Sequence, residues 1–413
     1  MLSAHTCPLA ALGGWETGGM NVYVRELSRA LGRQGIAVDV FTRRQDPAVP
    51  RVVEFGPGAR VIHLDAGPPR HLDKYEALEY LPELACNLQR FRALEGLSYD
   101  VIHSHYWLSG RLAAIFKERW GVPVVAMFHT LARAKTRAPL AEAEREDAIR
   151  EEIEQRLMLI ASRIIAATPA DRDHMIQDYG APRGAITVIP CGVDTTLFRP
   201  RPRPAARRQL GLGEERVLLF VGRIQQLKGI DLLLQSAAEL ARDSHPLTVL
   251  VVGGIPRFPD GRVSPEQAEM ARLLAIRDAL GLDDRVRFVG AVDQRLLPTY
   301  YSAADVTVVP SWYESFGLVA LESMACGTPV VAARVGGLAS LVRDGETGRL
   351  VPWRDPRLYA ERIRELCVPE TRKRLGRAAR ALAEQYSWTS VAEQVLEVYQ
   401  DVLGAAAPAT ARG

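Results

Sequence analysis

Short apolar runs alternate along this chain with longer stretches whose apolar residues recur every three to four positions. The runs have the length of strands and the stretches have the period of amphipathic helices. This alternation is typical of a parallel sheet covered by helices. In the first half, the predicted strands are residues 38–42, 61–64, 101–104, 124–128, 164–167 and 186–189. The helices predicted there are residues 21–34, 75–97, 108–119, 141–162 and 169–179.

A segment rich in proline and arginine, Phe198-Arg-Pro-Arg-Pro-Arg-Pro, interrupts the alternation. Proline fixes its own φ and has no amide proton, so we expect neither a helix nor a central strand here, and we interpret the segment as a linker. The alternation then restarts. The strands predicted after the linker are residues 217–221, 247–252, 286–289, 306–309 and 330–333. The helices include residues 231–242, 265–280, 317–326 and 357–366.

The pattern predicts an α/β protein with two consecutive Rossmann-like domains. We place the first domain at residues 1–197 and the second at 198–387. An amphipathic helix at about 388–404 can pack back on the first domain, and the tail 405–413 is expected to be disordered. Ligands of such sheets bind at the carboxyl ends of the strands, so we expect the site in the cleft between the domains.

Composition excludes several classes of protein. The chain is 47% hydrophobic and 24% charged, as in an ordinary globular protein. No apolar run reaches the roughly 18 residues of a membrane span. The five cysteines form no CxxC pair, which disfavours disulfides and structural zinc and favours a reducing cytoplasm. A net charge of +3 does not call for nucleic acid, and a small anion needs only a local basic site.

Arginine has replaced lysine almost everywhere. Of 52 basic residues only five are lysines: Lys74, Lys117, Lys135, Lys228 and Lys373. A lysine that remains can mark a position where a compact ammonium group is needed rather than a planar fork, although chance survival explains it as well.

A glycine-rich loop, Gly13-Gly-Trp-Glu-Thr-Gly-Gly-Met-Asn21, follows the end of a strand and opens a helix. Such loops let backbone amides approach a phosphate at the positive end of the helix. The loop lacks the GxGxxG spacing of nicotinamide enzymes, which disfavours that class. A plain turn remains the alternative.

Two cations five residues apart, Arg223 and Lys228, follow the first strand of the second domain. Both could meet a pyrophosphate and neutralise charge as a phosphate departs, without a divalent metal. The alternative is a solvated loop with ordinary charges.

Two carboxylates eight residues apart give the sharpest signal, in Ser311-Trp-Tyr-Glu314-Ser-Phe-Gly317-Leu-Val-Ala-Leu-Glu322. Glu322 lies in an otherwise apolar helix, where a carboxylate is costly unless it is hydrogen-bonded, so we expect a hydroxyl-rich partner. A core glutamate bonded to a neighbour is the alternative. Eight residues of helix span about 12 Å, enough to hold two ends of an extended ligand.

Histidines end two strands of the first domain: His103 and His105 before Tyr106, and His129 before Thr130. They lack the spacing and the acidic partners of a metal site, so we reject a metal centre.

Together these segments resemble the retaining family 4 glycosyltransferases of GT-B fold, along essentially the whole chain. The segments are Glu314-x7-Glu322, Gly-Arg-x4-Lys-Gly and the TGGMNVYV loop. Within that family, GGMNVYVREL, IHSHYWLSG and ESFGLVALE with ARVGG are most similar to the D-inositol-3-phosphate glycosyltransferases. Sucrose-phosphate synthases are the next likeness, although their loop usually has GGQ where this chain has Gly18-Gly19-Met20.

The resemblance implies a donor site in the second domain. Arg223 and Lys228 would hold the donor diphosphate, and Glu322 would bind the ribose. Glu314 would bind hydroxyls of the transferred sugar. Backbone amides would complete that site at Phe316, Gly317, Leu318 and Val319.

It also implies that the first domain binds the acceptor. His129 would lie beside the sugar near the reaction centre, Gly19 would face the diphosphate, and Asn21 would lie near the inositol ring. The residues implied for the acceptor phosphate are Lys74, Tyr106, Thr130 and Arg150. The Arg150 match requires a gapped alignment in the 133–154 region.

Three segments depart from the family pattern. The first strand is nearly absent at Met1-Leu-Ser, residues 133–147 differ and could reshape the acceptor pocket, and a longer polar stretch follows Gly253-Gly254.

We therefore expect a retaining hexosyltransferase that needs no metal or other cofactor. It would move GlcNAc or glucose from a UDP-sugar to a phosphorylated polyol such as inositol-3-phosphate, in the cytoplasm and as a monomer or a homodimer. One alternative is the use of UDP-glucose and fructose-6-phosphate by a sucrose-phosphate synthase. Alternatives from other classes are a UDP-GlcNAc 2-epimerase and a non-catalytic UDP-sugar-binding protein.

Overall fold

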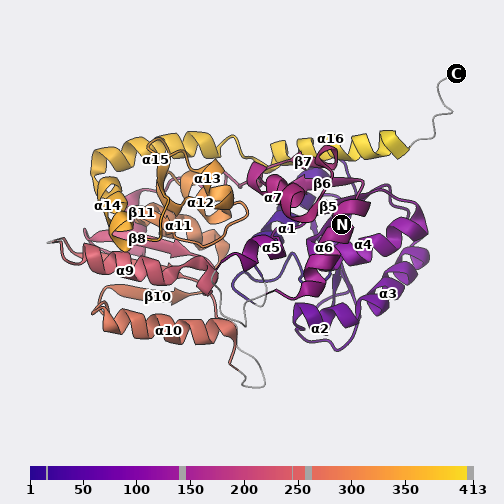
Figure 1. Ribbon diagram of the computed structural model, residues 1–413, viewed down its shortest axis with the longest axis horizontal. Coiled ribbons are helices and arrows are strands. Elements are labelled where there is room, and N and C mark those ends of the chain that lie inside the picture. The colour runs from indigo at the N-terminus through magenta and orange to yellow at the C-terminus, as the bar shows by residue number, and fades with distance from the viewer. Residues whose placement is uncertain (15–16, 139–145, 244, 256–262, 407–413) are drawn as a thin grey trace.

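The computed structural model describes residues 1–14, 17–138, 146–243, 245–255 and 263–406. Two α/β domains lie side by side, each with a central sheet (Figure 1). Among these residues no helix is both long and apolar enough to cross a bilayer.

The first domain is built on two sets of strands with a single residue between them. One set has the order β1-β3-β2 and the other has the order β4-β5-β6-β7. Leu2 pairs in parallel with Phe41 on one side and Ser104 on the other, so the nearly absent first strand survives as one bridging residue. The strands are β1 (Val38–Arg43), β2 (Val52–Gly56), β3 (Ala59–Leu64), β4 (Ile102–His105), β5 (Val124–Met127), β6 (Arg163–Ala166) and β7 (Ile186–Val188).

Seven helices among the described residues flank these strands. They are α1 (Gly19–Arg33), α2 (Lys74–Glu79), α3 (Leu81–Leu94), α4 (Tyr106–Trp120), α5 (Ala132–Thr136), α6 (Ala148–Ile160) and α7 (Pro169–Tyr179). The single helix predicted at 75–97 is wrong. The chain breaks at Tyr80 because Pro82, in the first turn of α3, has no amide proton to continue α2. Of the helix predicted at 141–162, residues 141–145 lie outside the described part.

The second domain has one six-stranded parallel sheet of order β10-β9-β8-β11-β12-β13. Its central strands are buried on both faces, as their unbroken apolar runs predict. The strands are β8 (Arg216–Val221), β9 (Leu247–Val252), β10 (Val286–Gly290), β11 (Val306–Val309), β12 (Val330–Ala333) and β13 (Gly348–Val351).

The helices of this domain begin inside the predicted linker. Helix α8 starts at Arg203, with Pro204 in its first turn, where a missing amide proton costs nothing. The expectation of no helix there is therefore wrong for the end of the segment. The helices are α8 (Arg203–Gln209), α9 (Ile230–Leu240), α10 (Pro265–Ala279), α11 (Leu297–Ala303), α12 (Leu318–Ala325), α13 (Gly336–Leu341), α14 (Pro356–Cys367) and α15 (Pro369–Ala383).

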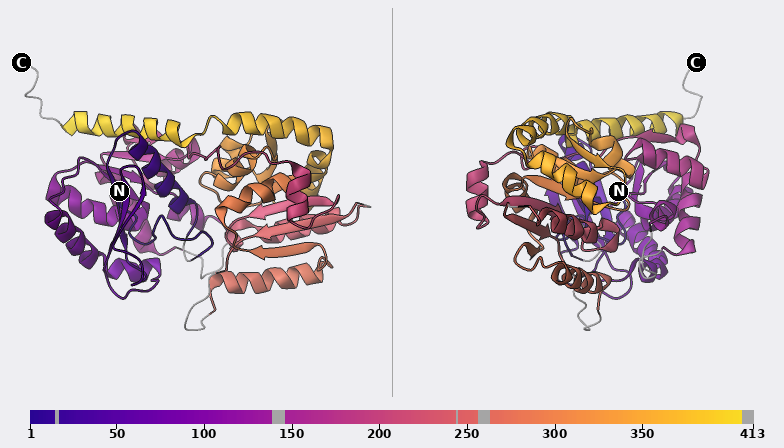
Figure 2. Two further views of the ribbon diagram at one scale, coloured as in Figure 1. Left: turned by 180° about the vertical axis from the view of Figure 1, so that it is seen from behind. Right: turned by 60° about the vertical axis from the view of Figure 1, so that its left-hand side comes forward.

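The last helix, α16 (Trp388–Ala406), runs from the second domain along the first (Figures 1 and 2). Residues 405 and 406, expected to be disordered, are its last two residues, and 407–413 lie outside the described part. The Tyr399 hydroxyl lies 2.7 Å from Nδ1 of His103 in β4. Trp388 packs edge-on against Tyr23 of α1, with ring centroids 5.5 Å apart.

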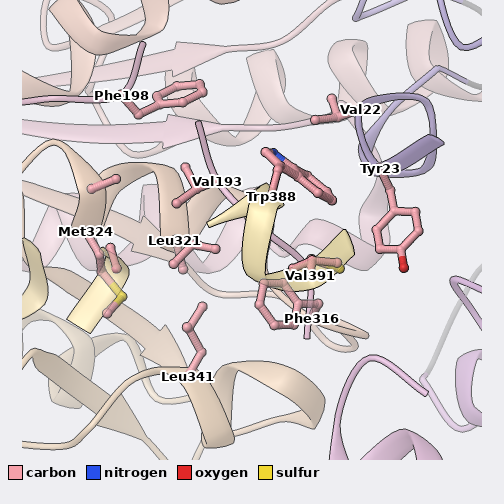
Figure 3. Packing of buried hydrophobic residues seen from close by; sticks show 14 of the residues in the cluster. Val22, Tyr23, Val193, Phe198, Phe316, Leu321, Met324, Leu341, Trp388 and Val391 are labelled. Carbon is pink, nitrogen blue, oxygen red and sulfur yellow. The ribbon is translucent and has the colours of Figure 1, made fainter. Parts of the chain in front are cut away.

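One apolar cluster spans both domains and α16 (Figure 3). It joins Tyr23 of α1 and Trp388 of α16 to Phe316 and Leu321 of the second domain. The two domains and α16 therefore share a continuous core. This core holds the two sheets, and the site residues at their strand ends, in a fixed relative position.

Candidate active site

The predicted site residues follow strands where the order of each sheet reverses. In the second domain β8 lies between β9 and β11, so the loops after β8 and β11 leave the sheet in opposite directions. In the first domain the bridge at Leu2 lies between β1 and β4 in the same way. Such switch points are where open α/β sheets bind ligands.

In the second domain the two predicted motifs meet. Lys228, after β8, places its Nζ 2.6 Å from Oε2 of Glu314, after β11. Both side chains keep about a fifth of their surface exposed. Arg223 donates to Oε1 of Glu266 in α10 at 2.9 Å. Two cations and a carboxylate thus border the carboxyl edge of this sheet.

The loop before α12 is held in place by tightly packed glycines. Gly317 caps α12 with φ 100°, a conformation that favours glycine. A Cβ at Gly337 would lie 2.3 Å from the Ser315 carbonyl oxygen. Phe316 is buried and Leu318 and Val319 are partly buried. The amino end of α12, with the partial positive charge of its backbone amides, therefore lies directly after Glu314.

Glu322 is 7% exposed and lies in the second turn of α12. In the structure Glu322 has a hydroxyl partner from the protein itself. The Tyr301 phenol donates a hydrogen bond to Oε2 of Glu322 at 2.9 Å. Burial raises the pKa of Glu322 to about 7, and the bond from Tyr301 opposes that shift. Glu322 lines a small cavity together with Gln294 and Trp388.

Four residues predicted for the acceptor phosphate form one cluster in the first domain. Arg150, in α6, is fully buried. Its guanidinium donates to the Tyr106 hydroxyl at 2.9 Å and to the hydroxyl of Thr130 at 3.0 Å. Lys74, at the start of α2, joins the cluster through Glu146, which both Lys74 and Arg150 contact.

Two residues of this edge hold strained backbone conformations. Tyr106 has φ 75° and His129 has φ 63°, where side chains other than glycine are rare. Such strain persists where the surrounding structure enforces it, and it concentrates at functional sites. Nε2 of His129 lies 3.1 Å from Nδ1 of His105, and burial lowers the pKa of His129 to about 3, so the ring is neutral at pH 7.

Two other predicted residues lie at the start of α1. A Cβ at Gly19 would lie 3.0 Å from a methyl of Leu318, so the domains touch here. Asn21 is 1% exposed. Its amide donates to Thr6 and to the Cys7 carbonyl, both at 2.8 Å, and its oxygen accepts from the Gly18 amide. Its contacts in the structure are therefore with its own loop.

The strand-end edges of the domains touch at further points. Arg25 donates to Gln294 at 2.6 Å, and the Ser315 hydroxyl donates to Asp171 of α7 at 2.6 Å. Asp171 is buried, which raises its pKa to about 7, and the nearby Glu314 charge adds to the shift.

Several of these groups carry little or no distinguishing signal in the sequence. Lys135 stood out only as a rare lysine, and Glu146 only by lying in the divergent segment 133–147. Nothing in the sequence pattern marked Tyr75, Asp171 or Tyr301. Among the residues that the structure describes, no three histidine, cysteine or acidic side chains are grouped as they would be around a metal ion.

Comparison with known proteins agrees with this architecture. Residues 202–382 match the family model for glycosyl transferases group 1, and residues 17–197 match that for Glycosyltransferase Family 4. The D-inositol 3-phosphate glycosyltransferase 2 of Catenulispora acidiphila is 44% identical over 97% of this chain and 93% of its own. The D-inositol 3-phosphate glycosyltransferase of Thermobispora bispora is 43% identical over 97% of this chain and 94% of its own.

A solved structure extends the likeness to three dimensions. The sucrose-phosphate synthase of Thermosynechococcus elongatus is 36% identical, with a TM-score of 0.90 over 98% of both chains. The predicted GT-B fold of two Rossmann-like domains is thereby confirmed.

Proposed function

Because the chain belongs to the family 4 glycosyltransferases and is a hexosyltransferase, we propose that it moves GlcNAc or glucose from a UDP-sugar to inositol-3-phosphate. Named relatives at 43–44% identity over 97% of the chain support this acceptor. The same relatives are transferases, so we set aside the epimerase and the non-catalytic binding protein.

The observation that carries the proposal is the cationic cluster around Arg150. A neutral polyol would not need the buried Arg150 and the partly exposed Lys74 in one cluster, whereas a phosphate group would. The Tyr106 and Thr130 hydroxyls next to Arg150 can add hydrogen bonds to phosphate oxygens. These are the residues that the family resemblance implies for an acceptor phosphate.

On the donor side, we propose that Arg223, Lys228 and the amino end of α12 stabilise a leaving diphosphate. Two fixed cations can neutralise the departing charge, so we propose that no metal ion is required. Glu314, which contacts Lys228, would hold hydroxyls of the hexose. We also propose that Glu322 binds the donor ribose. The Glu322 carboxylate would then accept hydrogen bonds from the ribose hydroxyls in addition to the one from Tyr301.

We propose retention of the anomeric configuration, with the acceptor attacking on the face that the diphosphate leaves. The leaving phosphate oxygen would take the proton of the acceptor hydroxyl. His129, with a pKa of about 3, is too weak a base for that step at neutral pH. Its neutral ring can instead hydrogen-bond a sugar hydroxyl.

Sucrose-phosphate synthesis is the second candidate, because the similarity to the Thermosynechococcus enzyme extends over 98% of the chain. Its acceptor, fructose-6-phosphate, also carries a phosphate, so the cluster around Arg150 does not separate the two reactions.

UDP release separates them. UDP-GlcNAc and UDP-glucose are each mixed with inositol-3-phosphate, with fructose-6-phosphate or with no acceptor, with and without EDTA. We expect release only when inositol-3-phosphate is present, and no loss in EDTA. Release from UDP-glucose with fructose-6-phosphate would move the chain to the second candidate. No release in any mixture would contradict both acceptors.

A further inference from the structure

The cluster proposed for the acceptor phosphate already holds an anion from the chain itself. The carboxylate of Glu146, two residues before α6, lies 2.6 Å from Nζ of Lys74 and 2.8 Å from Nζ of Lys135. It also lies 3.0 Å from Nη1 of Arg150 and accepts from the Tyr75 hydroxyl at 2.9 Å. One carboxylate thus forms ion pairs with three cations and accepts a hydrogen bond from one phenol.

The site is built and buried. The side chains of Glu146 and Arg150 are each 1% exposed, and those of Lys74 and Lys135 are 15% and 19% exposed. Burial alone would raise the pKa of Glu146, but the three cations hold it well below its usual range. The group is therefore a carboxylate at any physiological pH.

Charge within the cluster is not balanced. Besides Glu146, Arg150 pairs with the fully buried Glu154 at 2.7 Å. Three cations thus face two carboxylates, and removing Glu146 from its position would leave a net charge of +2. A phosphate monoester carries about −1.5 to −2 charges at pH 7 and three strong acceptor oxygens. It would satisfy the same donors more fully than a carboxylate with one charge and two oxygens.

We propose that Glu146 is an internal competitor of the acceptor phosphate: its carboxylate holds the phosphate subsite until a phosphorylated acceptor exchanges with it. This inference rests on the proposed function for its substrate class. It also gives Glu146 a role in specificity. A neutral polyol has no charge with which to displace a carboxylate held by three cations, so the enzyme rejects acceptors without phosphate.

Titration with inorganic phosphate by calorimetry tests the exchange directly on the full chain. Glu146→Gln removes the competing charge, and we expect it to bind phosphate at least tenfold more tightly than the wild-type protein. Glu152→Gln is the matched control, because Glu152 is exposed on α6, the helix that follows Glu146, and the substitution removes the same charge. It should bind phosphate as the wild-type protein does. An affinity of Glu146→Gln equal to or below the wild-type value overturns the proposal.

A double variant ties the gain to this cluster rather than to the donor site. Adding Lys74→Ala to Glu146→Gln removes a donor of the proposed phosphate subsite, and the tenfold gain should disappear. A gain that persists would mean that phosphate binds elsewhere, which also overturns the proposal.

Folding is checked in the same series. Phosphate should raise the unfolding temperature of Glu146→Gln more than that of the wild-type protein, because it replaces the missing anion. If Glu146→Gln does not fold, Glu146→Asp keeps the charge on a shorter side chain and should still bind phosphate more tightly than wild type; an unchanged or weaker affinity overturns the inference.

Phosphate binding requires no turnover, so this result is separate from the proposed function. A gain in Glu146→Gln supports the inference even if no hexose is transferred. If transfer occurs, the KM for the phosphorylated acceptor should fall in Glu146→Gln while the KM for the UDP-sugar stays unchanged. Transfer without any gain in phosphate affinity would leave the proposed function intact and refute the role of Glu146.

Discussion

At the scale of single residues, Lys228 is where two distant segments of the chain meet. Its ammonium group contacts Glu314, 86 positions later, and it is one of five lysines in a chain that otherwise uses arginine. A compact cation suits a position between a carboxylate and a diphosphate, where a planar guanidinium would present a different geometry. The same reasoning applies to Lys74 and Lys135, which share Glu146.

Lys228→Ala should reduce kcat about 100-fold or more with little effect on the unfolding temperature. In the proposed reaction the lost cation acts on the leaving diphosphate, and removing one such group typically costs that much in rate, while the side chain is partly exposed. The measurement is steady-state UDP release with thermal unfolding in parallel. Lys373→Ala, at an exposed lysine, is the control. Near-normal turnover in Lys228→Ala would refute the role.

At the scale of elements, the amino end of α7 docks on the loop that carries Glu314. Thr168 caps α7, and Asp171 in its first turn accepts the Ser315 hydroxyl. This contact buries a carboxyl group between the domains, next to a second carboxylate. The raised pKa of Asp171 is the result.

The contribution of Asp171 to the stability of the protein should therefore fall as pH rises from about 4 to about 7, whereas the buried histidines, whose pKa values burial lowers, contribute in the opposite direction. An unfolded aspartate loses its proton near pH 3.9, whereas Asp171 in the fold keeps it to about pH 7. In that window the Asp171 carboxyl binds more protons in the folded state than in the unfolded state, so its contribution to stability decreases by up to about 1.4 kcal/mol per pH unit. Glu322 acts in the same direction.

Asp171→Asn removes this contribution, so the stability of the variant relative to that of the wild-type protein should rise as pH rises from about 4 to about 7. Unfolding temperatures from pH 4 to pH 8 provide the measurement. Asp173→Asn serves as the control. It removes a carboxylate from the same helix, and the Asp173 side chain is 45% exposed. A difference in stability between Asp171→Asn and the wild-type protein that does not change with pH would contradict the burial argument.

At the scale of the whole molecule, α16 joins the two domains. Trp388 is 6% exposed and packs against Tyr23 of the first domain. A Cβ at Gly192 would lie 2.7 Å from the indole, so the backbone before the second domain is shaped to this ring. The loops at Gly13 in the first domain and Gly254 in the second are also in close contact, since a Cβ at Gly254 would lie 2.2 Å from the Gly13 carbonyl oxygen.

Trp388→Ala should destabilise the protein by about 3–5 kcal/mol, the usual cost of removing a large buried aromatic side chain. The unfolding temperature should fall, and UDP release should fall with it because the two domains lose a shared core. Trp353→Ala, at a tryptophan that is 72% exposed, should change neither. Equal stability of the two variants would show that α16 does not couple the domains.

The sequence by itself determined the two α/β domains and most strands, because a strand buried on both faces must be continuously apolar. It missed β2 and β13, at sheet edges where that requirement is weaker, and it did not anticipate the break at Tyr80. It also singled out Arg223, Lys228, Glu314 and Glu322 as candidate site residues, since charged groups after apolar strands or inside an apolar helix stand out locally.

Only the tertiary structure decided which of these groups meet. The contacts of Glu146 join positions 74, 75, 135 and 150, and no local pattern encodes such a pairing. Tyr301 as the partner of Glu322, and Asp171 as the partner of Ser315, are likewise products of packing. Periodicity reports the environment of one residue, whereas an ion pair depends on how distant elements are placed together.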